Sequence, residues 1–246
     1  MSKKPAAAPK SNPAYEPRAS SSRSTYFLVG VGVLVVALII IGLVWRATKT
    51  YPPVDDKVLA ENASFIVGQR TAPVTIDVFE DAACPHCGEF EQQSGGAINA
   101  AVDAGQIRVR YHLLNFLDGE SDSGDYSSRA AGAVLCVAED GDAAVFRSFH
   151  AALFARARQG QANGDDNELA QLAAQAGANE KTQTCIRDGA RVGAAKKMAD
   201  SSATQLSNSN EGNVATPSVL VAGAMVDDVM NGDGWLAKVV KDGGVK

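Results

Sequence analysis

Two cysteines, Cys84 and Cys87, limit what this chain can fold into, because they are separated only by Pro85 and His86. An apolar run at residues 74–79 precedes the pair and a segment of helical pattern follows it, which places the cysteines where a strand passes into a helix. Side chains at the start of a helix and one turn later are close enough to form a disulfide. The pair is therefore predicted to cycle between dithiol and disulfide.

The helix start favours the charged form of Cys84. Backbone N–H groups there have no intrahelical acceptor, and the helix macrodipole adds partial positive charge. Pro85 suits the first helical position, where its missing N–H would be unpaired anyway, and a protonated or donating His86 ring would further favour an anion. A thiolate is the attacking species, so Cys84 is the predicted nucleophile. A Cys84 pKa lowered by about three units would make the pair roughly 45 mV more oxidising.

This Cys-Pro-His-Cys stretch after a hydrophobic strand resembles the DsbA family of thioredoxin-fold disulfide oxidoreductases. The resemblance implies an α/β thioredoxin fold with an inserted all-helical subdomain, at about residues 119–207, and a redox-active dithiol that needs no cofactor and no metal. Two other interpretations remain open. A structural zinc site would need His112 and His150 to complete its ligands, because there is no second Cys-x-x-Cys, and the cysteines could also be a chance buried pair. His150, on an aromatic helix face, and His112, within a strand, are more typical of core histidines.

An uncharged apolar run of 20 residues occupies residues 26–45. As a helix it spans about 30 Å, the thickness of a bilayer's hydrocarbon core, and Tyr26 and Trp45 lie at its ends as interfacial aromatics do. A cleaved signal peptide is the alternative, but its apolar region is usually about 7 to 15 residues long, with a cleavage site close behind. The run is therefore predicted to be an uncleaved transmembrane anchor.

Basic residues predict the orientation of this anchor, because cytoplasmic flanks carry the excess of Lys and Arg. Five precede the run and three follow it: Lys3, Lys4, Lys10, Arg18 and Arg23, then Arg46, Lys49 and Lys57. Residues 1–25 are thus predicted to be a disordered cytoplasmic tail, residues 46–60 a linker, and residues 61–246 an extracytoplasmic thioredoxin-like domain, where disulfides persist. A net charge of -5 argues against nucleic acid as a partner.

Periodicity predicts the elements of this domain. Strands are expected at residues 65–67, 74–79, 107–116 and 214–221, with a hairpin partner at 224–229. Helices are expected at residues 88–104, with a kink at Gly95 and Gly96, and at 126–139, 143–156, 167–176, 180–187, 189–206 and 234–241. Strand, Cys-x-x-Cys helix and strand form a βαβ unit, which is the first half of a thioredoxin fold.

Two further pairs of residues gain a role from this framework. If Cys84 and Cys87 are functional, Cys136 and Cys185 are left to form a structural disulfide; two free buried thiols are the alternative. Thr216 and Pro217 are similar to the cis-proline element that faces the Cys-x-x-Cys in thioredoxin-like proteins, where the backbone before the proline can pair with an extended substrate. A trans proline capping an edge strand is the alternative.

Two departures from the family pattern leave details open. Thioredoxin-like enzymes often have a buried carboxylate six residues before the first cysteine, and Val78 occupies that place here. Asp77, Glu80 and Asp81 are nearby candidates for proton transfer, and the sequence does not choose among them. Ala215, before Thr216, stands where many relatives carry Gly.

The predicted function is a membrane-anchored oxidoreductase that donates the disulfide of Cys84 and Cys87 to reduced cysteines of secreted or cell-envelope proteins. By resemblance, a quinone-linked membrane oxidase would reoxidise the pair. A reductase or isomerase that uses the reduced pair is one alternative, and a non-catalytic peptide-binding module is another.

Overall fold

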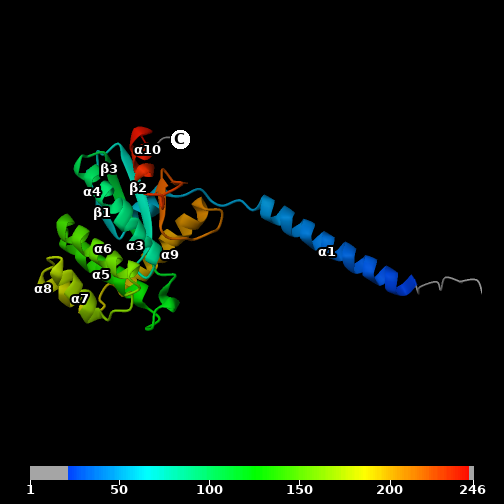
Figure 1. Cartoon of the computed structure of the whole chain (residues 1–246), viewed down its shortest axis with the longest axis horizontal. Helices are drawn as coiled ribbons and strands as arrows, with labels where there is room; N and C mark the ends of the chain where they lie inside the picture. Colours follow the sequence, from blue (N-terminus) through cyan, green and yellow to red (C-terminus); the bar gives the residue numbers. More distant parts are fainter. Residues whose placement is uncertain (1–21, 244–246) are drawn as a thin grey trace, which may run out of the picture. The chain divides into compact units, whose positions relative to one another are not determined.

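Residues 22–243 are described by a computed structural model, in which the chain divides after Thr50 into two compact units. The first contains one long helix, α1 (Ser22–Thr48), shown in blue in Figure 1. Its stretch Thr25–Trp45 is long and apolar enough to cross a membrane, and every side chain in that stretch is exposed. The predicted tail lies outside the described residues except for residues 22–25, which begin α1.

The second unit is built on a five-stranded mixed sheet with the strand order β1-β3-β2-β4-β5. Its strands are β1 (Phe65–Val67), β2 (Val74–Asp81), β3 (Ile107–Leu114), β4 (Ser218–Val221) and β5 (Ala224–Met225). β2 and β3 pair in parallel at the centre, and the other pairings are antiparallel. This is the α/β thioredoxin arrangement that the sequence predicts, and the fold class is confirmed.

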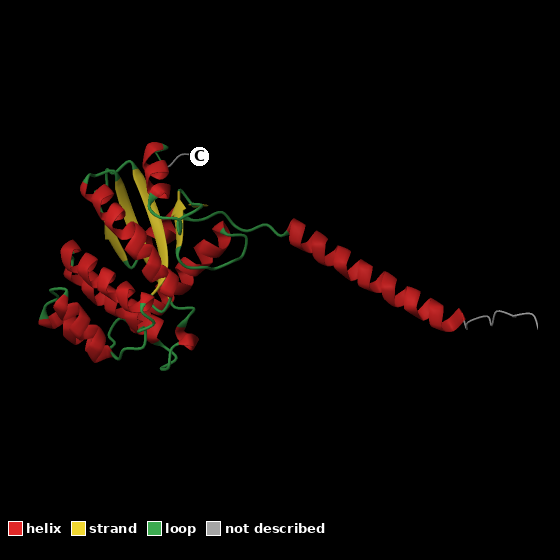
Figure 2. Ribbon diagram, viewed as in Figure 1, coloured by secondary structure: helices red, strands yellow, loops and turns green. Residues whose placement is uncertain are grey.

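Helices form the crossover between β2 and β3 and a separate insertion (Figure 2). The crossover consists of α3 (Pro85–Phe90), the π-helical turn η1 (Glu91–Gly95) and α4 (Gly96–Asp103). After the short 3-10 turn η2 (Asp118–Glu120) come α5 (Tyr126–Asp140), α6 (Ala143–Arg158), α7 (Asp166–Gln175), α8 (Glu180–Arg187) and α9 (Val192–Ser209). α10 (Gly234–Lys241) is the last helix described. The kink predicted at Gly95 and Gly96 lies where π geometry returns to α geometry.

The two faces of the sheet hold different cores, because side chains alternate along each strand. Ile76 and Val78 of β2 belong to the larger core, which includes residues of α3, α4, α6 and α10. Phe79 belongs to a smaller core on the other face, with Leu59 and Leu206. The position of a β2 residue in this alternation therefore decides which helices its side chain meets.

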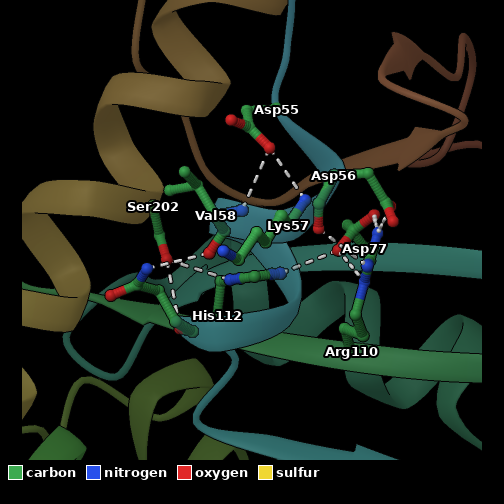
Figure 3. Close-up of polar contacts among 9 residues, drawn as sticks. Asp55, Asp56, Lys57, Val58, Asp77, Arg110, His112 and Ser202 are labelled. Carbon is green, nitrogen blue, oxygen red and sulfur yellow. Dashed lines mark hydrogen bonds and ion pairs between the residues drawn. The ribbon is translucent and has the colours of Figure 1, made fainter.

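A buried polar network fills part of the second face (Figure 3). Asp77 and Arg110 are register partners on β2 and β3, and the Arg110 guanidinium donates to both Asp77 carboxylate oxygens, at 2.6 and 2.7 Å. Arg110 also donates to the Asp56 carboxylate at 2.7 Å. The His112 ring lies between Asp77 and Ser202, 2.9 Å from each. The network ties α9, and the segment around Asp56, to the two central strands.

The linker predicted at residues 46–60 is wrong in its last part, where helix α2 (Asp56–Glu61) forms. The Asp55 side chain accepts hydrogen bonds from the backbone N–H groups of Lys57 and Val58, which caps the helix, and Leu59 is buried. The strand predicted at residues 214–221 begins only at Ser218, because Pro217 has no N–H to donate to the ladder. Its partner is shorter than predicted, with only Ala224 and Met225 paired.

A disulfide joins α5 to α8 through Cys136 and Cys185, within the helical insertion. Both helices also pack against each other and against α7. The bridge therefore links two helices of the segment that lies between β3 and β4 in the sequence.

Candidate active site

The two remaining cysteines lie at the end of β2, where the chain turns into α3. Cys84 is the N-cap residue of α3, Pro85 is its first residue, and Cys87 is one turn in. The turn is fixed by a 2.9 Å hydrogen bond from the Cys84 N–H to the Asp81 carbonyl. Both thiols are free, and Cys84 retains 6% of its surface exposed while Cys87 has none. Only the first sulfur is therefore open to another molecule.

The surroundings of Cys84 favour its thiolate and lower its pKa to about 5. The largest contribution is a hydrogen bond from the Cys87 thiol, which outweighs the opposing effect of burial. The Thr216 side chain and the backbone N–H groups of Cys87 and His86 add to it. These are donors aimed at one sulfur, so the negative charge is stabilised before any substrate arrives.

Cys87 has the opposite chemistry. Burial raises the pKa of its thiol well above the usual value, and the hydrogen bond to Cys84 and the negative charge of Glu80 raise it further. A thiol of this kind stays protonated at neutral pH. The pair therefore combines an ionised outer sulfur with a neutral inner one.

The His86 ring acts on Cys84 through its charge. Its ring is exposed, and Nδ1 lies 3.0 Å from the Glu89 carboxylate, which raises the pKa of the imidazole. The charge of the ring still attracts a Cys84 thiolate. The hydrogen bond that His86 gives to Cys84 comes from its backbone N–H, not from the ring.

The three candidate carboxylates of β2 occupy distinct positions. Asp77 is held in the polar network of the second face. Asp81, at the end of β2, accepts hydrogen bonds from the backbone of Ala83 and Leu117 and from the Ser127 hydroxyl, while burial raises its pKa to about 6. Asp81 thus shapes the turn that carries Cys84. Glu80 shares the alternation of Ile76 and Val78 and bears its charge next to the cysteines.

Glu80 is completely buried, and burial raises the pKa of its carboxyl. One oxygen, Oε2, lies 2.8 Å from His150 Nε2, and the other, Oε1, has no hydrogen-bond partner among the described residues. The other ring nitrogen of His150 lies 3.6 Å from Glu91 Oε2. His150 was expected to be a core histidine, and it is buried among Tyr111, Phe146 and Phe154.

The zinc interpretation needs Cys84, Cys87, His112 and His150 in one place, and the structure separates them. Both His112 ring nitrogens are engaged by Asp77 and Ser202, and its ring stacks on Phe79, whose side chain lies in the smaller core. The His150 ring packs instead against Tyr111, Phe146 and Phe154, which belong to the larger core with the cysteines. The cysteines and the two histidines therefore do not converge on one point.

The predicted substrate-binding residues face Cys84. The Thr216–Pro217 peptide bond is cis, and the Cys84 sulfur lies 3.5 Å from the Thr216 carbonyl oxygen. The Ala215 carbonyl accepts a 2.8 Å hydrogen bond from the Ser218 hydroxyl. Within residues 51–243, Phe116 and Val214 are the large hydrophobic side chains that remain exposed. Phe116 follows β3 at the edge where β2 also ends, and Val214 precedes Thr216.

Sequence reasoning did not select Glu91 or Phe116 as residues of the site. Strand alternation would have selected Glu80 from the three carboxylates, because only Glu80 follows Ile76 and Val78 at intervals of two. No comparable signal marks Glu91, whose position depends on a π-helical turn.

Comparison with known proteins places the chain by sequence. The sequence model of the family described as Thioredoxin matches residues 60–241. The chain belongs to the thioredoxin family. Within structures of this fold, the reduced form of a disulfide bond oxidoreductase, DsbG from Mycobacterium tuberculosis, is 32% identical, with a TM-score of 0.58 over 72% of this chain and 82% of that one. Oxidised DsbA from the same organism is 30% identical, with a TM-score of 0.58 over 75% and 90% of the two chains.

Two other relatives bear on this thioredoxin-family chain. MdbA, a thiol-disulfide oxidoreductase from Corynebacterium diphtheriae, has a TM-score of 0.64 at 24% identity over 81% of this chain and 98% of its own, which shows the fold alone. The serine/threonine-protein kinase PknE of Mycobacterium tuberculosis is 40% identical over 183 residues, or 73% of this chain. The match covers only 32% of the kinase, so kinase activity is not carried over. The resemblance to DsbA-like proteins is confirmed.

Proposed function

We propose that this protein is an extracytoplasmic thiol-disulfide oxidoreductase that donates the disulfide of Cys84 and Cys87 to reduced cysteines of secreted or envelope proteins. The observation that carries the proposal is the opposite ionisation of the two sulfurs, with the Cys84 pKa lowered to about 5 and the Cys87 pKa raised. The DsbA and DsbG relatives, at 30% and 32% identity, support the same chemistry.

The ionisation of Cys84 supports this direction of exchange. A thiolate that the protein stabilises exists only when the pair is reduced, so this stabilisation favours the dithiol over the disulfide. A lowered pKa therefore makes the disulfide a stronger oxidant and Cys84 a better leaving group. A reductase would need the reverse preference.

The reaction proceeds by two exchanges. A substrate thiolate attacks the Cys84 sulfur, the bond to Cys87 breaks, and Cys87 leaves and takes a proton. A second substrate thiolate attacks the substrate sulfur of the mixed disulfide and releases Cys84 as a thiolate. The substrate loses two electrons as its disulfide forms, and the enzyme pair gains them. Because Cys87 is a poor leaving group, it needs a proton donor nearby, and the buried pair of Glu80 and His150, which holds one shared proton, is the donor whose carboxyl acts on Cys87.

Recognition of the substrate is assigned to the surface around Cys84. The backbone of Thr216 offers groups with which an extended chain can pair, and the exposed side chains of Phe116 and Val214 offer apolar contacts. Such contacts suit unfolded chains, which expose both backbone and hydrophobic side chains.

Reoxidation requires an electron acceptor outside this chain. By family resemblance, a quinone-linked membrane oxidase would accept the two electrons from Cys84 and Cys87. The apolar stretch of α1 would hold the domain at the membrane where such a partner resides, with the N-terminus in the cytoplasm and Cys84 outside.

The test is refolding of a reduced, disulfide-containing secreted protein by the full chain in detergent, together with its reduction potential against glutathione. We expect catalysed disulfide formation and a potential more oxidising than about −200 mV, with no activity in Cys84→Ser. A reduction potential of about −270 mV, which is that of thioredoxin, would favour the reductase alternative. Binding of unfolded peptide without turnover would favour the non-catalytic module.

A further inference from the structure

The imidazole of His150 stands between two carboxylates that come from different elements. Nε2 faces Glu80 on β2 at 2.8 Å, and Nδ1 faces Glu91 on η1 at 3.6 Å. The three side chains are largely buried, with 3% of the His150 side chain and 12% of the Glu91 side chain exposed. A ring with an acceptor at each nitrogen is suited to carry two protons, which is the charged form of histidine. Burial opposes that charge, but the two carboxylates outweigh it and raise the His150 pKa to about 10.

The position of Glu91 is built into the backbone. Glu91 begins the π-helical turn η1, the kind of irregularity that often accompanies a functional site. A Cβ atom on Gly95, at the other end of that turn, would lie 2.4 Å from Glu91 Oε1. Gly95 therefore leaves the space that the Glu91 carboxylate occupies. No Cβ contact arises within 4 Å at Gly96, the next residue, so this tight fit is specific to Gly95.

The second carboxylate decides where the shared proton resides. Glu80 and His150 hold one proton between them, either as carboxylate and imidazolium or as carboxylic acid and neutral imidazole. Burial favours the neutral pair, since charges are costly to desolvate. Glu91 faces the imidazole at 3.6 Å, and its negative charge favours the proton on His150, although the same charge also raises the pKa of Glu80. Glu80 is then left ionised, with its free oxygen Oε1 available.

We propose that Glu91 is a positioning residue that acts through His150 to keep Glu80 as a carboxylate, ready to take the proton of Cys87 when the disulfide is re-formed. The inference rests on the proposed function, in which Cys87 attacks a mixed disulfide at Cys84 during reoxidation. In that step the Cys87 proton moves to Glu80, Cys87 bonds to the Cys84 sulfur, and the partner sulfur leaves as a thiolate. The Cys84 and Cys87 sulfurs lose the two electrons that the partner disulfide gains over the two exchanges.

The same three residues offer atoms within 4.8 Å of one another, which is close enough for a metal ion. Their arrangement does not fit one. An imidazole binds a metal through one nitrogen, so both carboxylates would have to approach that nitrogen, whereas here each carboxylate faces a different one. The geometry is that of an imidazolium hydrogen-bonded to Glu80 and ion-paired with Glu91.

Other ionisable groups also act on this site and set the background of any pH profile. They are Cys84 and Cys87 at the start of α3, Asp81 at the end of β2, Tyr111 on β3, and Arg147 on α6, which acts on Tyr111. All of them remain in place in a Glu91 variant, so a difference from the wild type reports on Glu91 itself.

The test is Glu91→Gln in the full chain in detergent, starting from the reduced protein and oxidised glutathione. Acid quenching at successive times separates formation of the mixed disulfide at Cys84 from its resolution by Cys87, and both are measured from pH 5 to pH 9. We expect formation to stay within about twofold of the wild type. Resolution at pH 7 should slow by about tenfold, the effect of roughly one pKa unit, and recover at alkaline pH, where the Glu80 and His150 pair loses its shared proton.

Gly95→Ala is the second variant, because its methyl group displaces the Glu91 carboxylate without removing it, and Gly96→Ala is the matched control. We expect Gly95→Ala to slow resolution as Glu91→Gln does, and Gly96→Ala to leave it unchanged. Resolution by Glu91→Gln at the wild-type rate over the whole pH range would overturn the inference, as would equal slowing of both steps. If a chelator slowed resolution of the mixed disulfide in the wild type, the three residues would be a metal site instead. A wild type that forms no mixed disulfide would defeat the proposed function, whatever the variants do.

Discussion

At the scale of single residues, one helical turn separates two thiols whose pKa values are shifted in opposite directions. Cys84 accepts hydrogen bonds and keeps 6% of its surface exposed, whereas Cys87 is buried without any exposure. The lowered pKa of Cys84 has a consequence for stability. Between the Cys84 pKa of about 5 in the folded protein and the ordinary cysteine pKa of 9.0, the unfolded chain binds more protons than the folded one, so the stability of the reduced protein rises with pH.

The first prediction concerns this rise. From pH 5 to pH 7 the free energy of unfolding of the reduced protein should increase by about 1 to 2 kcal/mol because of Cys84, allowing for partial screening by solvent. The increase should be absent from Cys84→Ser, which isolates it from the titration of carboxylates. Chemical denaturation at both pH values measures it, and the rate of alkylation by iodoacetamide should be half-maximal at about pH 5. Half-maximal alkylation near pH 9 would contradict the assigned environment.

The second prediction concerns Asp77, whose carboxylate is shared by Arg110 and His112. Asp77→Asn leaves a buried guanidinium without its main partner, which should lower the free energy of unfolding by about 3 kcal/mol. Asp56→Asn is the matched control. It removes the other carboxylate that Arg110 contacts, but the Asp56 side chain is 84% exposed, so the loss should stay below about 1 kcal/mol. Equal losses in urea denaturation of the two variants would refute the assignment.

Residue patterns predicted part of the site and left part of it out of reach. Cys84, Cys87, Thr216 and Pro217 were found because each belongs to a short contiguous motif. The family pattern places a buried carboxylate at position 78, whereas here Val78 fills that place and Glu80, two residues along the same strand face, is buried. Glu91 could not be found, since its role depends on a π-helical turn and on a histidine far away in sequence.

At the scale of elements, the active-site helix α3 packs directly on the end of α6. Gly88 makes this possible, because a Cβ there would lie 2.4 Å from the Phe154 carbonyl oxygen and 2.6 Å from the Arg158 Cβ. The third prediction is that Gly88→Ala lowers the free energy of unfolding by about 1 to 3 kcal/mol by overpacking, although alanine is the better helix former. Gly96→Ala, which meets no neighbour, should be neutral or stabilising. Thermal unfolding measures both, and the same sign in both would contradict the contact.

Hydrophobic periodicity located most elements, because a helix buries one continuous stripe of side chains and a strand buries every second side chain. Residues 65–67, 180–187 and 234–241 were predicted with the bounds that the structure has. Element ends were less accessible. α2 is only six residues long and depends on the Asp55 cap and on tertiary contacts of Leu59, so its periodic signal was too weak. The late start of β4 reflects hydrogen bonding at Pro217, which hydrophobic patterning does not report.

At the scale of the whole molecule, the disulfide constrains the insertion independently of the active-site pair. Cys136 and Cys185 are separated by 49 positions, so the bridge removes about 4 kcal/mol of unfolded-state freedom in the chain-entropy model. The fourth prediction is that the double variant Cys136→Ser and Cys185→Ser unfolds at lower denaturant while the Cys84 pKa stays near about 5. Unchanged stability would show that the bridge does not constrain the unfolded chain, and a shifted Cys84 pKa would show that the two disulfides are coupled.

The fifth prediction concerns attachment to the membrane, because a dithiol at the surface can exchange with secreted proteins only on the outer side. The stretch Thr25–Trp45 is long and apolar enough to span a bilayer. If it were instead a signal peptide, it would be cleaved from the secreted protein. We expect the full chain to resist alkaline carbonate extraction, whereas a chain beginning at Tyr51, the first residue of the second unit, should be released. A maleimide that does not cross membranes should label Cys84 in intact cells. The other cysteines do not compete for the label, because Cys87 is fully buried and Cys136 and Cys185 are joined in a disulfide. Labelling only after lysis would show that the domain lies on the cytoplasmic side, where it could not meet secreted substrates.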